Sequence, residues 1–307
     1  MTRVRNLIVA LTLIAAFSAV QALAQGQVIY NSIPSPLHGN VVSIGYEADS
    51  TSEFGDRIQF ASGGRKLFTV TQTMSSWGCQ AGHWYSNDCV SLPGSTFTHP
   101  LTLNIYNVGA GNSVGTLIGS VTQTFAIPYR PSASAGCSDG RWFNPADSTC
   151  YNGYATNVTF NLGGLVVPNQ VIYSIAYNTS HSGYVPIGSG AACYASPGGC
   201  GYDSLNVGLE GNPTVGSAPA PADAYNNTTY APYYCDGGTG GVGVFRLDSG
   251  CYAGDDFSWL LSTRFNAVNT PVVANDCKNG GWQSRTRADG SLFKNQGDCV
   301  SYTNNGR

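Results

Sequence analysis

Beyond the first 24 residues, apolar and polar side chains alternate with a period of two between clusters of Gly, Pro and Asn. The segment 66–74 places Phe68, Val70 and Met74 on one face and threonines on the other, and 101–108 alternates in the same way. This pattern is typical of half-buried β-strands, and no segment after residue 24 has helical periodicity. Further strands are predicted at 41–48, 115–127, 157–162, 171–178, 204–210, 242–247 and 257–265.

The number and spacing of these segments predict the fold class. Segment 171–178 is apolar on both faces, as expected of a central strand. About ten to twelve strands with many turn signals favour an all-β fold, a jelly-roll-like β-sandwich, over a barrel or several small domains. The Pro-rich stretch 211–234 lacks alternation and is interpreted as a surface loop. The pattern stops near 266, so we predict a sandwich domain over 25–265 and a linker with a small C-terminal disulfide segment over 266–307.

The first 24 residues have the composition of a secretory signal peptide. Arg3 and Arg5 precede an apolar run over 7–20, and small residues follow at Ala22 and Ala24. The run is too short for a confident membrane span, and no later run approaches the roughly 20 apolar residues that a span requires. We therefore expect export, a secreted extracellular location and no membrane span in the mature chain.

All ten cysteines follow residue 24, and an even number in an exported chain predicts a disulfide framework. A zinc site is disfavoured, because the sequence has no CxxC motif and its four histidines are scattered. Spacing leaves the connectivity open, and pairing of neighbours is the preferred interpretation. The predicted pairs are Cys79–Cys89, Cys137–Cys150, Cys193–Cys200, Cys235–Cys251 and Cys277–Cys299. The fourth is the least secure, since it would enclose the predicted strand 242–247.

The charge composition disfavours one class of partner. Charged residues make up 10% of the chain, far below the ~25% of ordinary soluble domains. Without Arg3 and Arg5 the chain has 12 basic and 17 acidic side chains, and no basic stripe could follow a phosphate backbone. Nucleic acid is therefore not an expected partner, and the oligomeric state stays open.

The pattern CxxGxW occurs three times, beginning at Cys79, Cys137 and Cys277. Glycine at the fourth position permits a tight turn with positive φ, and the tryptophan two residues later can fold back over the disulfide. In the preferred interpretation each tryptophan covers its own disulfide as a miniature core. In the alternative, aromatic residues on these loops form exposed platforms that stack on sugar rings or other apolar faces. The candidate binding residues are Trp84, Tyr85, Trp142, Phe143 and Trp282.

Two strings resemble catalytic or cofactor motifs but lack their structural context. The GxSxG match at 111–115 lies in a predicted hairpin, whereas a nucleophile elbow needs a strand that leads into a helix. The GxGxxG match at 238–243 has no surrounding βαβ unit. No catalytic residue and no cofactor are predicted, and the protein is interpreted as a non-enzyme.

A hydrolase remains the alternative, because two carboxylates could converge from distant strands. A calcium site is a weaker hypothesis. Asp139, Asn144 and Asp147 offer oxygen ligands within one short loop, but Asp and Asn in turns more often bond their own backbone.

Two resemblances add expectations. The stretches LTLNIYNVGAGNSVGTLIGSVTQTF and VTFNLGGLVVPNQVIYSIAYN, within about 65–180, resemble bacterial secreted β-sandwich domains of the choice-of-anchor type. This resemblance implies an exported jelly-roll-like module of unassigned function. The segment CKNGGWQSRTRADGSLFKNQGDCVSY resembles a short terminal segment of otherwise different bacterial exported proteins, which implies export.

The sequence thus predicts a secreted β-sandwich that acts as a binding or structural module. Its partner in the first case is carbohydrate or other cell-surface material, and in the second case further copies of the protein. The alternative is a secreted hydrolase that acts on extracellular polysaccharide.

Overall fold

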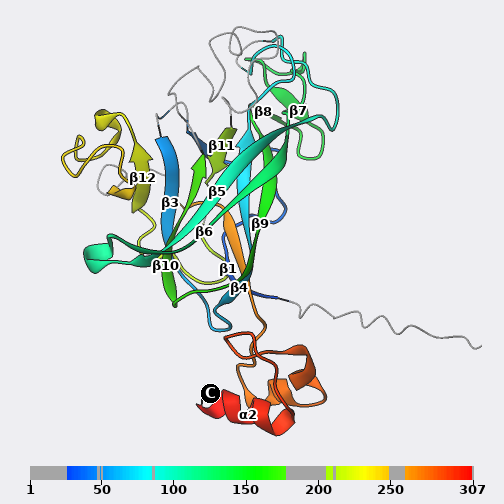
Figure 1. Ribbon diagram of the computed structural model, residues 1–307. Coiled ribbons are helices and arrows are strands. Elements are labelled where there is room, and N and C mark those ends of the chain that lie inside the picture. The colour runs from blue at the N-terminus through cyan, green and yellow to red at the C-terminus, as the bar shows by residue number, and fades with distance from the viewer. Residues whose placement is uncertain are drawn as a thin grey trace, which may run out of the picture.

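The computed structural model describes residues 26–46, 49, 51–84, 87–177, 205–209, 212–248 and 260–305. Two antiparallel six-stranded sheets pack face to face (Figure 1). One sheet contains β1 (Gln27–Asn31), β14 (Thr263–Ala267), β4 (Lys66–Ser76), β11 (Leu205–Gly208), β2 (Ser43–Gly45) and β9 (Tyr154–Val166). The other has the order β13 (Arg246–Asp248), β12 (Ala224–Thr228), β3 (Thr51–Gln59), β10 (Gln170–Tyr177), β5 (Thr96–Val108) and β6 (Val114–Pro128). The predicted β-sandwich class is confirmed, and a jelly-roll connectivity stays a prediction.

The smaller elements lie outside these two sheets. The hairpin β7 (Trp142–Asn144) and β8 (Thr149–Tyr151) belongs to the second cysteine loop. The short helices are η1 (Ala110–Asn112), η3 (Ala231–Tyr233), η4 (Ala274–Cys277), η5 (Gly281–Ser284) and α2 (Gln296–Asn305). No helix in the described ranges has the length and apolar character needed to span a membrane.

The apolar residues of the alternating segments point into the core, as the sequence predicted for β5 and β9. Leu101, Leu103 and Ile105 of β5 are buried between the sheets, and Phe160 of β9 packs into the same cluster. Strand β10 lies between β3 and β5 and is buried on both faces, which confirms its prediction as a central strand.

The prediction of which β4 side chains face the core is wrong for Phe68. The pairing of β4 with β9 shifts register between Leu67 and Thr69, as it does at a β-bulge. The bulge turns Leu67 into the core and leaves Phe68 37% exposed, whereas strict alternation placed Phe68 inside. Val70 and Met74, beyond the bulge, are fully buried as predicted.

Two strands of the β10 sheet were not predicted. Strand β3 was missed because Glu53, Asp56 and Arg57 interrupt its apolar pattern, although all three are buried. Strand β12 lies inside the Pro-rich stretch 211–234, so the interpretation of that whole stretch as a loop is wrong. The backbone of β12 pairs with both β3 and β13, although three of its five residues are Asn or Thr.

Side chains and a short strap link the two sheets at their sides. The Gln123 side chain of β6 donates to the Asn161 carbonyl at 3.2 Å and accepts from the Asn161 amide at 3.3 Å. This side chain mimics a strand partner and covers the edge of β9. At the other side, residues 214–217 bond both Asn31 of β1 and Gln59 of β3.

The C-terminal residues form a small cluster of their own. Cys277, Phe293 and Cys299 are buried together, with Trp282 and Tyr302 packed against them. This cluster is separate from the core between the sheets and lies beyond one end of the sandwich (Figure 1). Strand β14 continues to Ala267, so the predicted domain boundary after 265 falls within a strand.

Candidate functional site

Three of the predicted disulfides form. They join Cys79 to Cys89, Cys137 to Cys150 and Cys277 to Cys299. Cys235 is also disulfide-bonded. The predicted pair Cys193–Cys200, and Cys251 as the predicted partner of Cys235, lie outside the described residues.

Trp142 is not an exposed platform. Its side chain is 5% exposed, and its Nε1 donates a hydrogen bond to the Gly153 carbonyl at 2.7 Å. Its ring packs on those of Tyr151 and Tyr154, each at a centroid distance of 5.6 Å. The indole completes a small aromatic core within the second cysteine loop, in agreement with the preferred interpretation that it covers its own loop.

The other platform candidates differ in their burial. Trp84 is half-buried and packs edge-on against Trp77 at 4.7 Å, while Tyr85 lies outside the described residues. Phe143 is 45% exposed. Trp282 is partly buried and packs against the cluster around the Cys277–Cys299 disulfide, where it covers that bridge. Among the described candidates, Phe143 alone is an exposed side chain.

Arg130 joins the first two cysteine loops, and sequence reasoning did not single it out. Its side chain is fully buried, and its guanidinium donates to the carbonyls of Pro131 at 3.2 Å, Trp84 at 3.1 Å and Gly140 at 2.5 Å. Burial lowers the pKa of Arg130 to about 10. The first CxxGxW loop supplies Trp84 and the second supplies Gly140, so one buried cation holds both loops.

The calcium candidates do not form one set of oxygen ligands. The Asn144 amide donates to Asp147 Oδ2 at 3.0 Å, and the Asn144 side-chain oxygen accepts from the Ala146 amide. Asp139 pairs instead with Arg141 at 3.1 Å. Within the described ranges no cluster of three or more His, Cys, Asp and Glu side chains could hold a metal ion. Asn144 and Asp147 accept hydrogen bonds from the backbone of their own turn, as the simpler interpretation of Asp and Asn in loops predicted.

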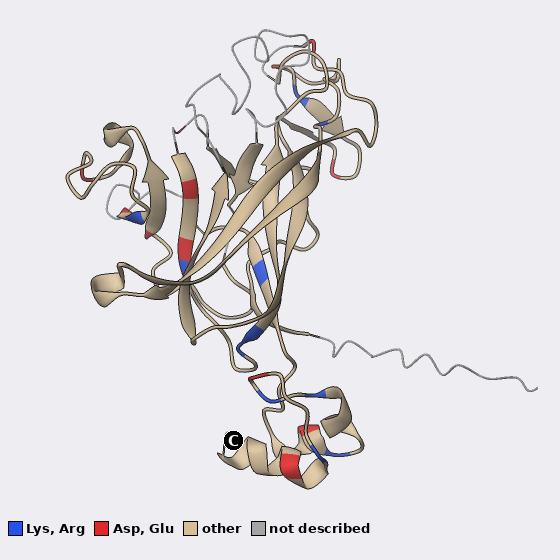
Figure 2. Cartoon of the chain, viewed as in Figure 1, with Lys and Arg blue, Asp and Glu red and all other residues tan. Residues whose placement is uncertain are grey.

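A different polar site lies on the outer face of the β10 sheet, around Glu53 of β3. Figure 2 shows few charged positions on the sandwich, and acidic positions on β3. The Glu53 side chain is 8% exposed. Its Oε1 accepts hydrogen bonds from Asn104 Nδ2 at 2.9 Å, from the Tyr106 hydroxyl at 3.0 Å and from the Ser174 hydroxyl. Three neutral donors from two neighbouring strands thus hold one carboxylate oxygen.

Strand register explains why these side chains meet. Residues that pair across adjacent strands point to the same face of a sheet. Glu53 pairs with Ala176, which pairs with Thr102, and Ser174 pairs with Asn104. The inward residues of the same strands form the core, so this polar row lies on the outer face.

The aromatic rings of Phe245 and Tyr106 lie beside the Glu53 side chain. A Cβ at Gly55 would lie 2.6 Å from the Phe245 ring, so the glycine allows Phe245 to cover β3 next to Glu53. The ring of Tyr106 lies 5.4 Å from that of Phe245. Burial, together with the neighbouring Glu53 carboxylate, raises the pKa of Tyr106 above its usual range, so its hydroxyl remains a donor.

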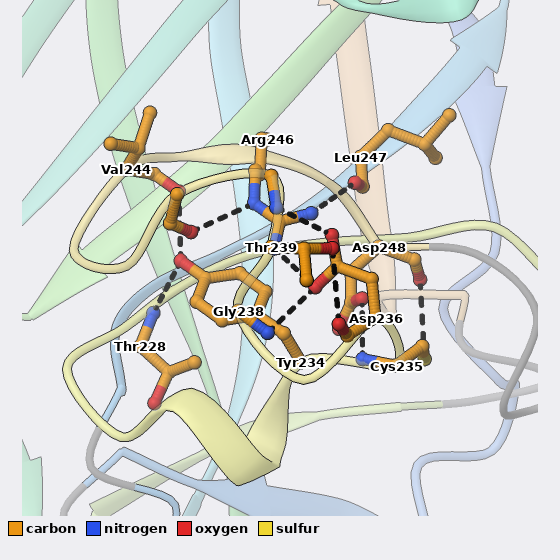
Figure 3. A network of polar contacts seen from close by, with 12 residues as sticks. Thr228, Tyr234, Cys235, Asp236, Gly238, Thr239, Val244, Arg246, Leu247 and Asp248 are labelled. Atoms are coloured by element: carbon orange, nitrogen blue, oxygen red, sulfur yellow. Dashed lines mark hydrogen bonds and ion pairs between the residues drawn. The ribbon is translucent and has the colours of Figure 1, made fainter.

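The loop that presents Phe245 is held by Arg246 (Figure 3). The guanidinium stacks 3.9 Å above the Tyr234 ring and pairs with Asp236 at 2.7 Å. The hydrogen bond from Arg246 is the main cause that lowers the pKa of Asp236 to about 2. Tyr234 in turn donates to the Val244 carbonyl at 2.9 Å, next to Phe245. This network fixes the β12–β13 loop beside the Glu53 site.

The Glu53 side chain lines a pocket of about 390 Å³ that is formed by residues of β3, β5, β6 and β10. The hydroxyls of Thr102 and Thr122 face each other across β5 and β6 at 2.7 Å. Glu53 is the only charged residue among those that line the pocket in the described part of the chain. The lining includes Ser52, Glu53, Pro100, Thr102, Thr122 and Ala176.

The second carboxylate oxygen of Glu53 differs from the first. Among the described residues, no group contacts Oε2, and this atom is not buried. The carboxylate is therefore oriented through Oε1 and retains Oε2 as an acceptor. The sequence carried little signal for this site, because Asn104, Tyr106 and Ser174 are ordinary outward residues of alternating strands.

Fold and site define a disulfide-bonded, two-sheet β protein with an acidic pocket on one outer face. No protein-family model matches the chain. Neither a curated protein nor a solved structure matches it. The resemblance noted over about 65–180 therefore assigns the chain to no family.

Proposed function

We propose that the protein is a non-catalytic module that binds carbohydrate in the Glu53 pocket. The observation that carries this proposal is the carboxylate held in place by Asn104, Tyr106 and Ser174 with a second oxygen left as an acceptor. Sugar hydroxyls are donors for such an acceptor, and the Thr102 and Thr122 hydroxyls can exchange further hydrogen bonds. A few fixed polar groups in a concave site are typical of small-ligand recognition.

The pocket gives less support to the alternative of a polysaccharide hydrolase. Most glycosidases use two carboxyl groups about 5–10 Å apart, one on each side of the scissile bond. In the described lining Glu53 is the only carboxylate. A single oriented acceptor suits binding better than acid–base cleavage.

We also propose that the protein acts outside the cytoplasm. Three disulfides in the described ranges are consistent with folding in an oxidising compartment. The signal peptide predicted over 1–24 lies outside the described residues, and N-terminal sequencing of the secreted protein would test it.

A glycan array probed with the purified protein tests the binding function. We expect selective capture of glycans, and a loss of affinity of about tenfold or more for Glu53→Gln and Thr102→Val, since the first replaces an acceptor oxygen by an NH2 donor and the second removes a hydroxyl. Asp139→Asn is the control, because Asp139 is exposed and pairs with Arg141 in a cysteine loop.

Capture that is unchanged in both pocket variants would contradict the proposal. Absence of capture, together with a sedimentation coefficient that rises with concentration, would favour a self-assembling structural protein.

A further inference from the structure

We infer that the Glu53 pocket selects a sugar that carries a primary ammonium group, as an unacetylated amino sugar does. This inference rests on the proposed function and names the ligand class for the same pocket. It starts from the charge of Glu53, which no cation of the described residues pairs with.

The groups that contact Glu53 are all neutral. Its donors are one amide and two hydroxyls, from Asn104, Tyr106 and Ser174. The ion pairs in the described part of the chain join other residues, and none includes Glu53. Its formal negative charge is therefore held by hydrogen bonds alone.

Burial makes this arrangement costly without a ligand. A carboxylate that is 8% exposed has lost most of its water, and a buried charge is stabilised best by an opposite charge together with hydrogen bonds. The protein supplies the hydrogen bonds. A cationic ligand would supply the charge, and it would interact more strongly here than with an exposed carboxylate.

The geometry favours an ammonium over other cations. Oε1 already accepts three hydrogen bonds, so the carboxylate cannot also offer two open oxygens to a planar guanidinium. A calcium ion requires six to eight oxygen ligands, and the described lining contains one carboxylate. An ammonium has three donors on a compact head, which match Oε2 and the hydroxyls of Thr102 and Thr122.

The net charge of the molecule also favours a cationic ligand over an anionic one. The full sequence has a formal net charge of −3, and the pocket lining in the described ranges contains no cation. Sugars with carboxylate or sulfate groups would be repelled by Glu53. The expected order of affinity is therefore amino sugar, then neutral sugar, then acidic sugar.

Calorimetry on the full mature protein tests this order. The ligands are a glucosamine trisaccharide, its fully N-acetylated form and a uronic acid trisaccharide. We expect the free amine to bind about tenfold or more tightly than the N-acetylated form, because a charge-assisted hydrogen bond is about twice as strong as a neutral one. The preference should decrease between about 0.05 and 0.5 M salt, because part of the attraction is screened.

Two variants assign the preference to the pocket. Glu53→Gln removes the charge and should bind the free amine and the N-acetylated form equally. Thr122→Lys places a cation at the pocket from an exposed position on the edge strand β6, and should reduce amine binding even if Glu53→Gln fails to fold. The exposed control Asp139→Asn should keep the wild-type preference.

The outcomes separate this inference from the proposed function. If the wild type binds the amine and the N-acetylated form equally, the inference is wrong and the carbohydrate-binding function stands. If no trisaccharide binds, both fail. Binding of an arginine-containing peptide more tightly than the amine, or an amine preference that persists in Thr122→Lys, would also overturn the inference.

Discussion

Strand β3 places two carboxylates on opposite faces of the same sheet. Glu53 lies on the outer face and is held by neutral donors, whereas Asp56, three residues later, points into the core and is fully buried. Asp56 pairs across the sheet with Tyr173, and its Oδ1 accepts from the Arg57 amide at 2.6 Å. Burial, the largest cause, raises the pKa of Asp56 well above its ordinary value. One carboxylate of β3 is thus held by neutral donors on the outer face, whereas the other is buried in the core with a raised pKa.

The raised pKa of Asp56 makes stability depend on pH. The folded state holds the Asp56 proton more tightly than the unfolded state, so this stabilisation is complete below the unfolded pKa of about 3.9 and is lost as pH rises from there toward the folded pKa. Asp56→Asn keeps a neutral acceptor for the Arg57 amide. We therefore expect Asp56→Asn to gain stability relative to the wild type as pH rises, by about 1–3 kcal/mol at pH 8.

Urea unfolding at several pH values between 4 and 8 measures this difference. The nearby groups that also bear charge or titrate are Tyr30, Tyr173, Arg57 and Asp223. The tyrosines have raised pKa values and stay neutral in this range, so they do not add to the slope. Parallel stability profiles for the two proteins would contradict the argument.

Individual strands show what the sequence could predict and what it could not. Alternation identified β5, β9 and β10, because each buries one or both faces against apolar neighbours. It failed for β3, because the hydrogen-bond donors around Glu53 lie on β5 and β10, which the sequence does not show to be neighbours of β3. It also misplaced Phe68, because a bulge is set by pairing with a distant strand.

The candidate site shows the same difference between features that are local in the sequence and features that depend on strand pairing. The sequence favoured tryptophans next to cysteines, since local spacing is visible in a chain. The preferred interpretation, in which these tryptophans form small cores, agrees with the burial of Trp142 and the packing of Trp282. The Glu53 pocket depends on the register of β3, β10 and β5, and sequence-local patterns do not contain that register.

Arg130 connects two loop elements, and its substitution tests that connection. Arg130→Lys keeps the charge but cannot reach the carbonyls of Pro131, Trp84 and Gly140 at once, because an ammonium is compact and lacks the planar fork of a guanidinium. Buried carbonyls without donors are costly, so we expect the free energy of unfolding to fall by about 2–4 kcal/mol. Chemical denaturation measures this change.

The control is Arg141→Lys in the same loop. Arg141 is partly exposed and bonds Ser138 and Asp139 near the surface, so its substitution should change stability by less than about 0.5 kcal/mol. Equal effects of the two substitutions would show that Arg130 does not join the loops.

At the scale of the whole molecule, two cores are stabilised in different ways. The core between the sheets is large, and it is closed at its sides by Gln123 and by the strap at 214–217. The C-terminal cluster contains few buried residues around the Cys277–Cys299 disulfide, and an apolar core of this size needs a covalent link to stay folded. The two cores should therefore respond differently to loss of a disulfide.

The double substitution Cys277→Ser with Cys299→Ser tests this difference. We expect residues 274–305 to lose hydrogen-exchange protection, because the remaining contacts of Phe293 and Trp282 cannot offset the entropy of the opened loop. The amides of β4 and β10 should stay protected, and the main melting temperature should move by less than about 4 °C, which corresponds to about 1 kcal/mol. The matched control, Cys137→Ser with Cys150→Ser, opens a loop that Arg130 ties to the sandwich and should lower the main transition further. If the first pair of substitutions lowered the main transition as much as the second, the C-terminal cluster would be part of one cooperative unit with the sandwich.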